Sequence, residues 1–149
     1  MHYADTPVVR LRGLRSVTLG VPDPVTSKDF YNEVWGLGLT EAVRTALAEA
    51  KLGLHEIDCR FSDVTGELYG FKELPLVEGR LMRVVRKREQ PLWHWAEVIG
   101  DSGAAAGALQ LVAADEAFRK GYAPGERIIC LTSAGPGDRA SAVLRRSAR

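Results

Sequence analysis

The chain has 149 residues, of which 46% are hydrophobic and 26% are charged, an ordinary composition for one globular domain. Its formal net charge is +1, so no strong overall field draws it to nucleic acid or to anionic lipid. No stretch approaches 18 consecutive apolar residues, and the first ten residues lack the apolar core of a signal peptide. These features predict a cytoplasmic domain without a membrane span or a nucleic-acid partner.

The first 39 residues carry the weakest pattern. Residues 1–10 have no clear period and are expected to be a flexible lead-in, which leaves residues 11–149 as the single domain. Leu14 to Val21 is rich in β-branched residues and ends at a Pro-Asp-Pro turn, which predicts a strand. Residues 25–38 are ambiguous, because a short helix begun at Ser27 would soon meet Gly36 and Gly38.

A helix and a strand follow with clearer signals. Thr40 is a good N-cap, apolar residues then recur at helical spacing, and Gly53 stands where such a helix would end. From Ile57 to Ser62 apolar and polar residues alternate, which predicts a strand with Asp63 near its C-terminal end.

Glu67 to Lys87 is expected to be a long helical stretch, kinked or divided at Pro75. Its expected buried face consists of Val77, Leu81, Val84 and Val85. Basic residues three and four positions apart would share another face: Arg80, Arg83, Arg86, Lys87 and Arg88. That basic face is either a docking surface for an acidic partner or simply a solvated surface.

Residues 91–103 are expected to form a loop that contains Trp93, His94 and Trp95. Asp101 or Ser102 then caps a helix over residues 104–120, which is apolar almost all round and should therefore be central and buried.

The C-terminal region predicts a hairpin. Residues 128–131 are a continuous apolar run, as expected for a strand covered on both faces. A Gly-Pro-Gly turn separates it from a final strand over residues 139–144, expected to run antiparallel. The order of elements indicates an α/β layered fold with a mixed sheet covered by helices.

Two segments resemble one family. Phe-Ser-Asp-Val-Thr-Gly-Glu at 61–67 is similar to the ketosynthase stretch Asn-Ala-His-Gly-Thr-Gly-Thr, which also ends a strand. Gly-Asp-Ser-Gly-Ala-Ala-Ala-Gly at 100–107 is similar to Gly-His-x-Gly-Ala-Ala-x-Gly, which opens the buried helix of that domain. With similar flanks, residues 40–144 resemble the C-terminal half of a thiolase-fold, β-ketoacyl synthase-like protein, which implies a thiolase-like half-domain.

The resemblance breaks at the two active-site histidines. In that family they stand beside a nucleophilic cysteine and stabilise the thioester oxyanion, whereas this chain has Asp63 and Asp101 at those positions. An ionised carboxylate has no proton to donate to an oxyanion. If the family geometry holds, the two carboxyls converge on one pocket, where they could share a proton as an acid/base pair. Alternatively, they merely cap a strand end and a helix start.

A second, weaker resemblance covers residues 11–39. The segment is similar to the opening strand and helix of glyoxalase/dioxygenase-type modules, with Ser16 near the place of a metal-binding histidine. The remaining strands of such a module do not follow.

The other candidates each have a structural alternative. Trp93 and His94 either border a ligand channel or pack in a core, and Glu67 either lines the pocket or begins a helix. Arg80, Arg83 and Lys87 are the candidates for docking an acyl carrier protein. Cys59 and Cys130 are expected to be free and inert inside strands. His55, Cys59 and Asp63 cannot converge along a strand, so no metal site and no cofactor are expected.

The expected function is that of a degenerate ketosynthase-like module, non-catalytic or accessory, which binds a partner or an acyl thioester. The partner would be a second copy or a cysteine-bearing ketosynthase-like subunit, because a lone half exposes the faces that normally pack on the other half. The first alternative is an acyltransferase whose nucleophilic cysteine comes from another chain. The second, weaker alternative is a glyoxalase-like metal module.

Overall fold

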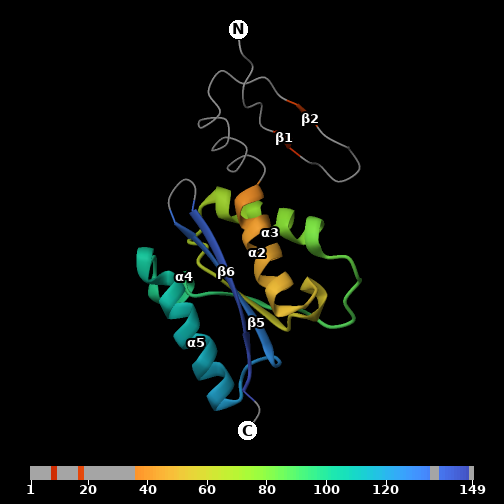
Figure 1. Ribbon diagram of the computed structural model, residues 1–149. Coiled ribbons are helices and arrows are strands. Elements are labelled where there is room, and N and C mark those ends of the chain that lie inside the picture. The colour runs from red at the N-terminus through yellow and green to blue at the C-terminus, as the bar shows by residue number, and fades with distance from the viewer. Residues whose placement is uncertain (1–7, 10–16, 19–35, 135–137, 148–149) are drawn as a thin grey trace.

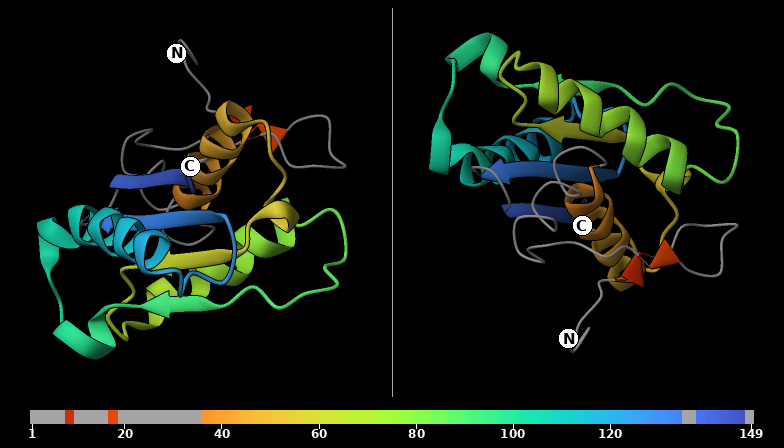
Figure 2. Two further views of the ribbon diagram at one scale, coloured as in Figure 1. Left: turned by 90° about the horizontal axis from the view of Figure 1, so that it is seen from below. Right: turned by 90° about the horizontal axis from the view of Figure 1, so that it is seen from above.

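A computed structural model describes residues 8–9, 17–18, 36–134 and 138–147 of the chain (Figure 1). Four strands form one mixed sheet: β3 (Cys59–Ser62), β4 (Leu92–His94), β5 (Arg127–Ala134) and β6 (Asp138–Arg145). They lie side by side in the order β4–β3–β5–β6, as Figure 2 shows. β3 runs parallel to β4 and to β5, whereas β5 and β6 are antiparallel. The predicted mixed α/β class is confirmed.

Helices cover both faces of this sheet. The helices are α2 (Leu37–Ala50), α3 (Leu68–Leu81), α4 (Ala96–Ile99) and α5 (Ala106–Lys120), with 3-10 turns at Leu54–Glu56 and Gly103–Ala105. One core lies between the sheet and α2 and α3, and the other lies between the sheet and α5. In Figure 1, α4 and α5 are on one side of the molecule and α2 and α3 on the other.

The strand β5 divides its side chains between these two cores. Ile129 and Leu131 face α2 and α3, whereas Ile128 and Cys130 face α5, and all four are buried. Alternation along a strand sends successive side chains to opposite faces, so a continuous apolar run fits a strand covered on both. The predicted strand over residues 128–131, its hairpin and its antiparallel partner are confirmed, although the turn at 135–137 lies outside the described residues.

The predicted start of the first long helix is wrong. α2 begins at Leu37, directly after Gly36, whose φ of +55° is accessible to glycine at little cost. Gly38 therefore lies inside α2 instead of ending an earlier helix. Thr40 is not the cap, because its Oγ1 donates to the Gly36 carbonyl oxygen at 2.9 Å from within the helix.

The predicted extent of the second helix is also wrong. α3 contains Pro75 but ends at Leu81 instead of Lys87. Val84 and Val85, expected in its buried face, are 51% and 91% exposed. The residues after Leu81 form an irregular segment, where the Arg86 guanidinium donates to the Ile57 carbonyl oxygen and so holds the chain away from a helical path.

The predicted basic helix face is therefore absent. Arg80 is the one member of that set within α3, and its guanidinium donates to the Gly36 carbonyl oxygen and to Thr40 Oγ1. Arg83 and Lys87 follow the helix end and do not share a helix face with it. Docking of an acyl carrier protein at Arg80, Arg83 and Lys87 thus loses the geometry on which it was predicted.

The segment expected as a loop over residues 91–103 contains a strand. Leu92 to His94 pair in parallel with Arg60 to Ser62, and they are followed by the short helix α4. A three-residue run gives too little alternation to be distinguished from a loop by pattern.

Near the N-terminus, β1 (Val8–Val9) pairs antiparallel with β2 (Val17–Thr18). β2 falls within the predicted strand from Leu14 to Val21, and β1 falls within the expected lead-in. Ser16, near the place of the metal-binding histidine in the second resemblance, and residues 25–35, where a short helix was one interpretation, lie outside the described residues.

Candidate functional site

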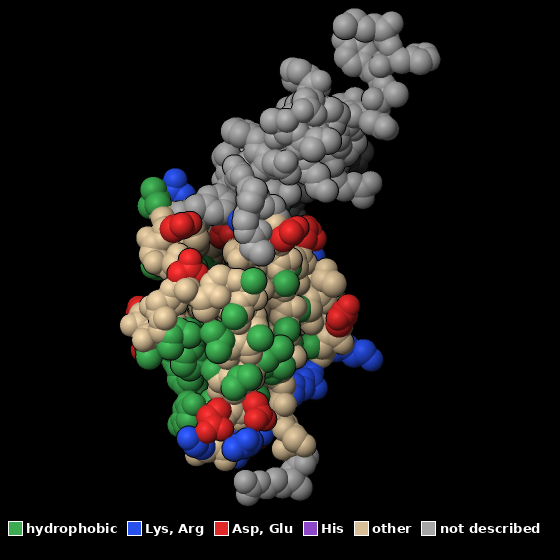
Figure 3. Space-filling view, turned by 90° about the vertical axis from the view of Figure 1, so that its left-hand side faces the viewer, with side chains coloured by type: hydrophobic (Ala, Val, Ile, Leu, Met, Phe, Trp, Pro, Cys, Tyr) green, Lys and Arg blue, Asp and Glu red, His purple; other side chains and the backbone are tan. Residues whose placement is uncertain are grey.

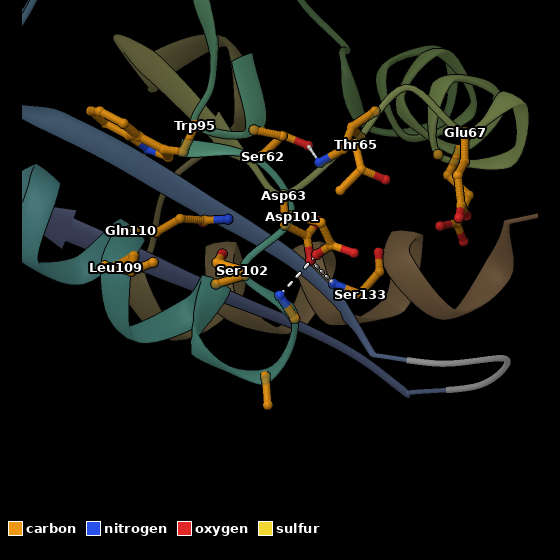
Figure 4. Close-up of a pocket in the computed structure, with 18 of the residues that line it drawn as sticks. Ser62, Asp63, Thr65, Glu67, Trp95, Asp101, Ser102, Leu109, Gln110 and Ser133 are labelled. Carbon is orange, nitrogen blue, oxygen red and sulfur yellow. Dashed lines mark hydrogen bonds between the residues drawn. The ribbon is translucent and has the colours of Figure 1, made fainter. Parts of the chain in front are cut away.

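A pocket of about 320 Å³ opens where the C-terminal ends of β3 and β5 meet the segment that precedes α5. The strand β3 supplies Ser62 and the following Asp63, whereas α5 supplies Gln110. Asp101 comes from the turn after α4, and Ser133 comes from β5 (Figure 4). The structure thus brings Asp63 and Asp101 into one pocket, as the family resemblance implies.

Asp63 is held at the inner wall of this pocket. Its Oδ2 accepts a hydrogen bond of 2.6 Å from the Ser133 backbone N–H. Burial raises the pKa of the Asp63 carboxyl, because a charged carboxylate loses hydration there. The hydrogen bonds from the backbone of Ser133 and of Asp63 itself, together with Arg139, lower this pKa, and Asp101 raises it. The net direction is upward, so desolvation outweighs the favourable contacts.

Asp101 fits both alternatives that the sequence predicts, a place in the pocket and a capping role before a helix. It lines the pocket, and its Oδ1 also accepts a hydrogen bond of 2.8 Å from the Gly103 backbone N–H at the turn before α5. A side-chain acceptor for a backbone donor two residues on is the usual local role of aspartate at a helix approach. Asp101 is exposed, whereas Asp63 is partly buried, so the two carboxyls have different surroundings.

An ion pair that the sequence did not reveal forms another wall. Arg139 Nε of β6 lies 2.9 Å from Glu73 Oε2 and 3.2 Å from Glu73 Oε1 of α3. Their side chains are 6% and 2% exposed. The two residues are 66 positions apart, and neither belongs to a recognisable motif, so no sequence signal could have paired them.

Gln110 is the second residue that sequence reasoning missed. It is 1% exposed on the inner face of α5, and its Nε2 donates to the Leu131 carbonyl oxygen at 3.0 Å. Its Oε1 has no hydrogen-bond partner among the described residues. Leaving a buried acceptor unpaired costs about 1–3 kcal/mol. A polar residue amid the apolar run of residues 104–114 was the signal available in the sequence.

The remaining predicted site residues separate into two groups. Glu67 lines the pocket, and so does Trp95. Trp93 and His94 do not: Trp93 stacks on Phe61 with ring centroids 5.3 Å apart, and His94 meets Phe71 edge-on at 6.0 Å. The core alternative therefore describes Trp93 better than the channel hypothesis.

Neither cysteine is poised for chemistry. Cys59 and Cys130 are free and buried, and burial raises the pKa of each thiol to about 12. A thiol with such a pKa is almost entirely protonated near neutral pH, and the thiolate is the nucleophilic form. Among the described residues, no group of three or more His, Cys, Asp and Glu side chains is placed to hold a metal ion.

The raised pKa of Asp63 gives a prediction about stability. The Asp63→Asn variant should gain stability relative to the parent as the pH rises from 3.8, the ordinary aspartate pKa, through the raised pKa of the folded state. Well below pH 3.8 the parent carboxyl is neutral in both states, so the difference should be smallest there. Urea unfolding of both proteins from about pH 3 to about pH 8 spans the titration of this carboxyl and measures the difference in the free energy of unfolding. A difference that does not change with pH would contradict the assignment.

Neither a comparison with protein-family models nor a search of curated proteins gives a match for this sequence. In the part of the chain that the structure describes, no helix has both the length and the apolarity to cross a membrane.

Proposed function

We propose that this chain is a thiolase-like half-domain that acts as a non-catalytic, accessory module, and that it associates with a second copy through the outer face of α5. The observation that carries this proposal is the distribution of side chains on α5, where small or polar residues are buried and large apolar residues are exposed. Its buried positions hold Gln110, Ala114 and Ala117, whereas its large apolar side chains Leu111 and Val112 are 45% and 67% exposed.

Together with exposed apolar side chains of the short helix α4, which lies on the same side of the molecule in Figure 1, those of α5 make up an exposed apolar surface. Its members are Val98, Ile99, Leu109, Leu111 and Val112. Figure 3 shows hydrophobic side chains gathered on the side of the molecule where α4 and α5 lie, with charged side chains at its lower edge. We name this surface the α5 face. Large apolar side chains gathered on one exposed side of a protein are typical of association sites.

The α5 face suits a second copy of the chain. From residue 102 to residue 114 the sequence carries no charged side chain, so two copies meet no like-charge repulsion along this part of the helix. The charges of α5 lie beyond it, where Arg119 and Lys120 pair with Asp115 and Glu116 of the same helix. A twofold pair of α5 helices would also restore the two-domain arrangement that the family resemblance implies.

The alternative functions receive no support from the site. An acyltransferase would need a cysteine from another chain, since Cys59 and Cys130 are buried thiols with a pKa of about 12. The aspartates in the pocket are also poor partners for a developing oxyanion. The glyoxalase-like alternative depends on residues 11–39, most of which lie outside the described part of the chain.

The proposal predicts that the protein dimerises and that Val112→Glu weakens the dimer. A carboxylate in the middle of an apolar interface should cost at least about 2 kcal/mol, or roughly 30-fold in Kd. Sedimentation velocity over a range of protein concentrations measures the Kd of the parent dimer and that of the variant dimer. The matched control is Val85→Glu, since Val85 is 91% exposed and lies in the irregular segment after α3, outside the α5 face.

Two outcomes would oppose the proposal. The first is a parent protein that stays monomeric at high concentration, and the second is a Val112→Glu dimer as tight as that of Val85→Glu. The native mass of the complex captured from the source cells distinguishes the two possible partners. A mass of twice the chain indicates a second copy, whereas a larger mass would indicate a ketosynthase-like subunit as the partner instead.

A further inference from the structure

The pocket beside α5 is strongly acidic, which sets it apart from a site for an anionic acyl group. Four carboxylate residues line it, namely Asp63, Glu67, Glu73 and Asp101. Among the described residues that line it, the one cation is Arg139, whose guanidinium is held by Glu73 at 2.9 Å. A cavity with this balance of charge attracts cations and repels carboxylates.

Gln110 gives a second and independent indication of the ligand. The Leu131 carbonyl oxygen can only accept, so the amide nitrogen of Gln110 must face it and the amide oxygen must be the free group. That Oε1 is buried and has no partner among the described residues. In Figure 4 the Gln110 side chain extends from α5 toward the side of the pocket where Asp101 and Ser102 lie. The unmet requirement is thus for a hydrogen-bond donor.

The size and walls of the pocket limit the ligand further. A volume of about 320 Å³ lies near the lower end of the range for small-molecule sites. Apolar parts of the lining come from Val64, Trp95 and Leu109. These walls suit a short aliphatic group attached to the polar head.

We propose that this pocket binds a small aliphatic amine in its primary ammonium form. The three N–H donors of the ammonium group match the acceptors that the pocket offers, which are Gln110 Oε1 and the carboxylates of Asp63 and Asp101. The aliphatic part lies against Trp95 and Leu109.

The test uses n-butylamine as the probe, with sodium butyrate and n-butanol as probes of the same length that lack the ammonium group. Isothermal titration calorimetry and two-dimensional NMR of the full chain near neutral pH should show saturable binding of butylammonium, with shifts at Gln110 and Trp95. Butyrate and butanol should give neither. Asp101→Asn keeps an oxygen for the Gly103 N–H and should weaken binding at least about tenfold, because an ammonium loses a charge-assisted hydrogen bond.

The control variant is Asp115→Asn, which neutralises an exposed carboxylate on α5 outside the pocket lining. It should leave butylammonium binding unchanged. The proposal is overturned if butyrate or butanol binds as well as butylamine. It is equally overturned if Asp115→Asn weakens binding as much as Asp101→Asn does, since the attraction would then be a general effect of surface charge.

Discussion

Glu73→Ala is expected to lower the free energy of unfolding by about 3–5 kcal/mol, because it removes the carboxylate of a buried ion pair with Arg139. The two side chains are 2% and 6% exposed, so water cannot replace the lost partner without opening the structure. Their contact also joins α3 to β6 at the edge of the pocket. Urea unfolding monitored by tryptophan fluorescence measures the loss, which should appear as a lower midpoint at an unchanged slope.

The double variant Glu73→Leu with Arg139→Met separates the cost of removing one partner from the contribution of the pair as a whole. Replacing both partners by apolar residues of similar volume is often neutral or even stabilising, so this protein should be markedly more stable than Glu73→Ala. A double variant as unstable as the single one would mean that the pair contributes through specific geometry instead.

The parts of the fold that were predicted correctly are those with strong periodicity. The alternation from Ile57 to Ser62 contains β3, and the apolar run at 128–131 marks the buried middle of β5. A side chain buried on a strand leaves a repeat of two in the sequence, and burial on both faces leaves an unbroken apolar run. These signals are local, so one sequence suffices to find them.

The failures share a different cause, which is that a tertiary contact decided the local structure. The basic run after Leu81 satisfies the spacing of a helix, but Arg86 is held instead by the backbone carbonyl of Ile57. The strand β4 exists because Leu92 to His94 meet the free edge of β3. Such contacts between distant segments leave no periodic trace.

The residues of the candidate site also divide into those that the sequence predicts and those that only the structure reveals. Asp63 and Asp101 were found because they stand in segments that resemble a family, whereas Gln110 and the Glu73–Arg139 pair gain their meaning from burial alone. The helix over 104–120, apolar almost all round until Asp115, is predicted to be central and buried, yet Leu111 and Val112 are exposed in the single chain. This disagreement supports the proposed dimer, because a partner could bury apolar residues that the single chain leaves exposed.

Phe61→Ala is expected to lower the free energy of unfolding by about 3–5 kcal/mol, since it empties the centre of the core beneath α5. Phe61 is 0% exposed, stacks on Trp93 at 5.3 Å and meets Trp95 edge-on at 5.4 Å. Urea unfolding measures the loss, and Phe61→Leu, which keeps most of the volume, should cost much less.

The same variant tests whether the core supports the pocket. Trp95 lines the pocket and rests against Phe61, so removing the ring takes away the surface that positions that wall. Phe61→Ala should therefore weaken butylammonium binding under conditions where the variant is still folded, whereas Phe61→Leu should bind nearly as the parent does. If Phe61→Ala is destabilised but binds the amine unchanged, the polar groups at Asp63, Asp101 and Gln110 determine binding without the aromatic wall.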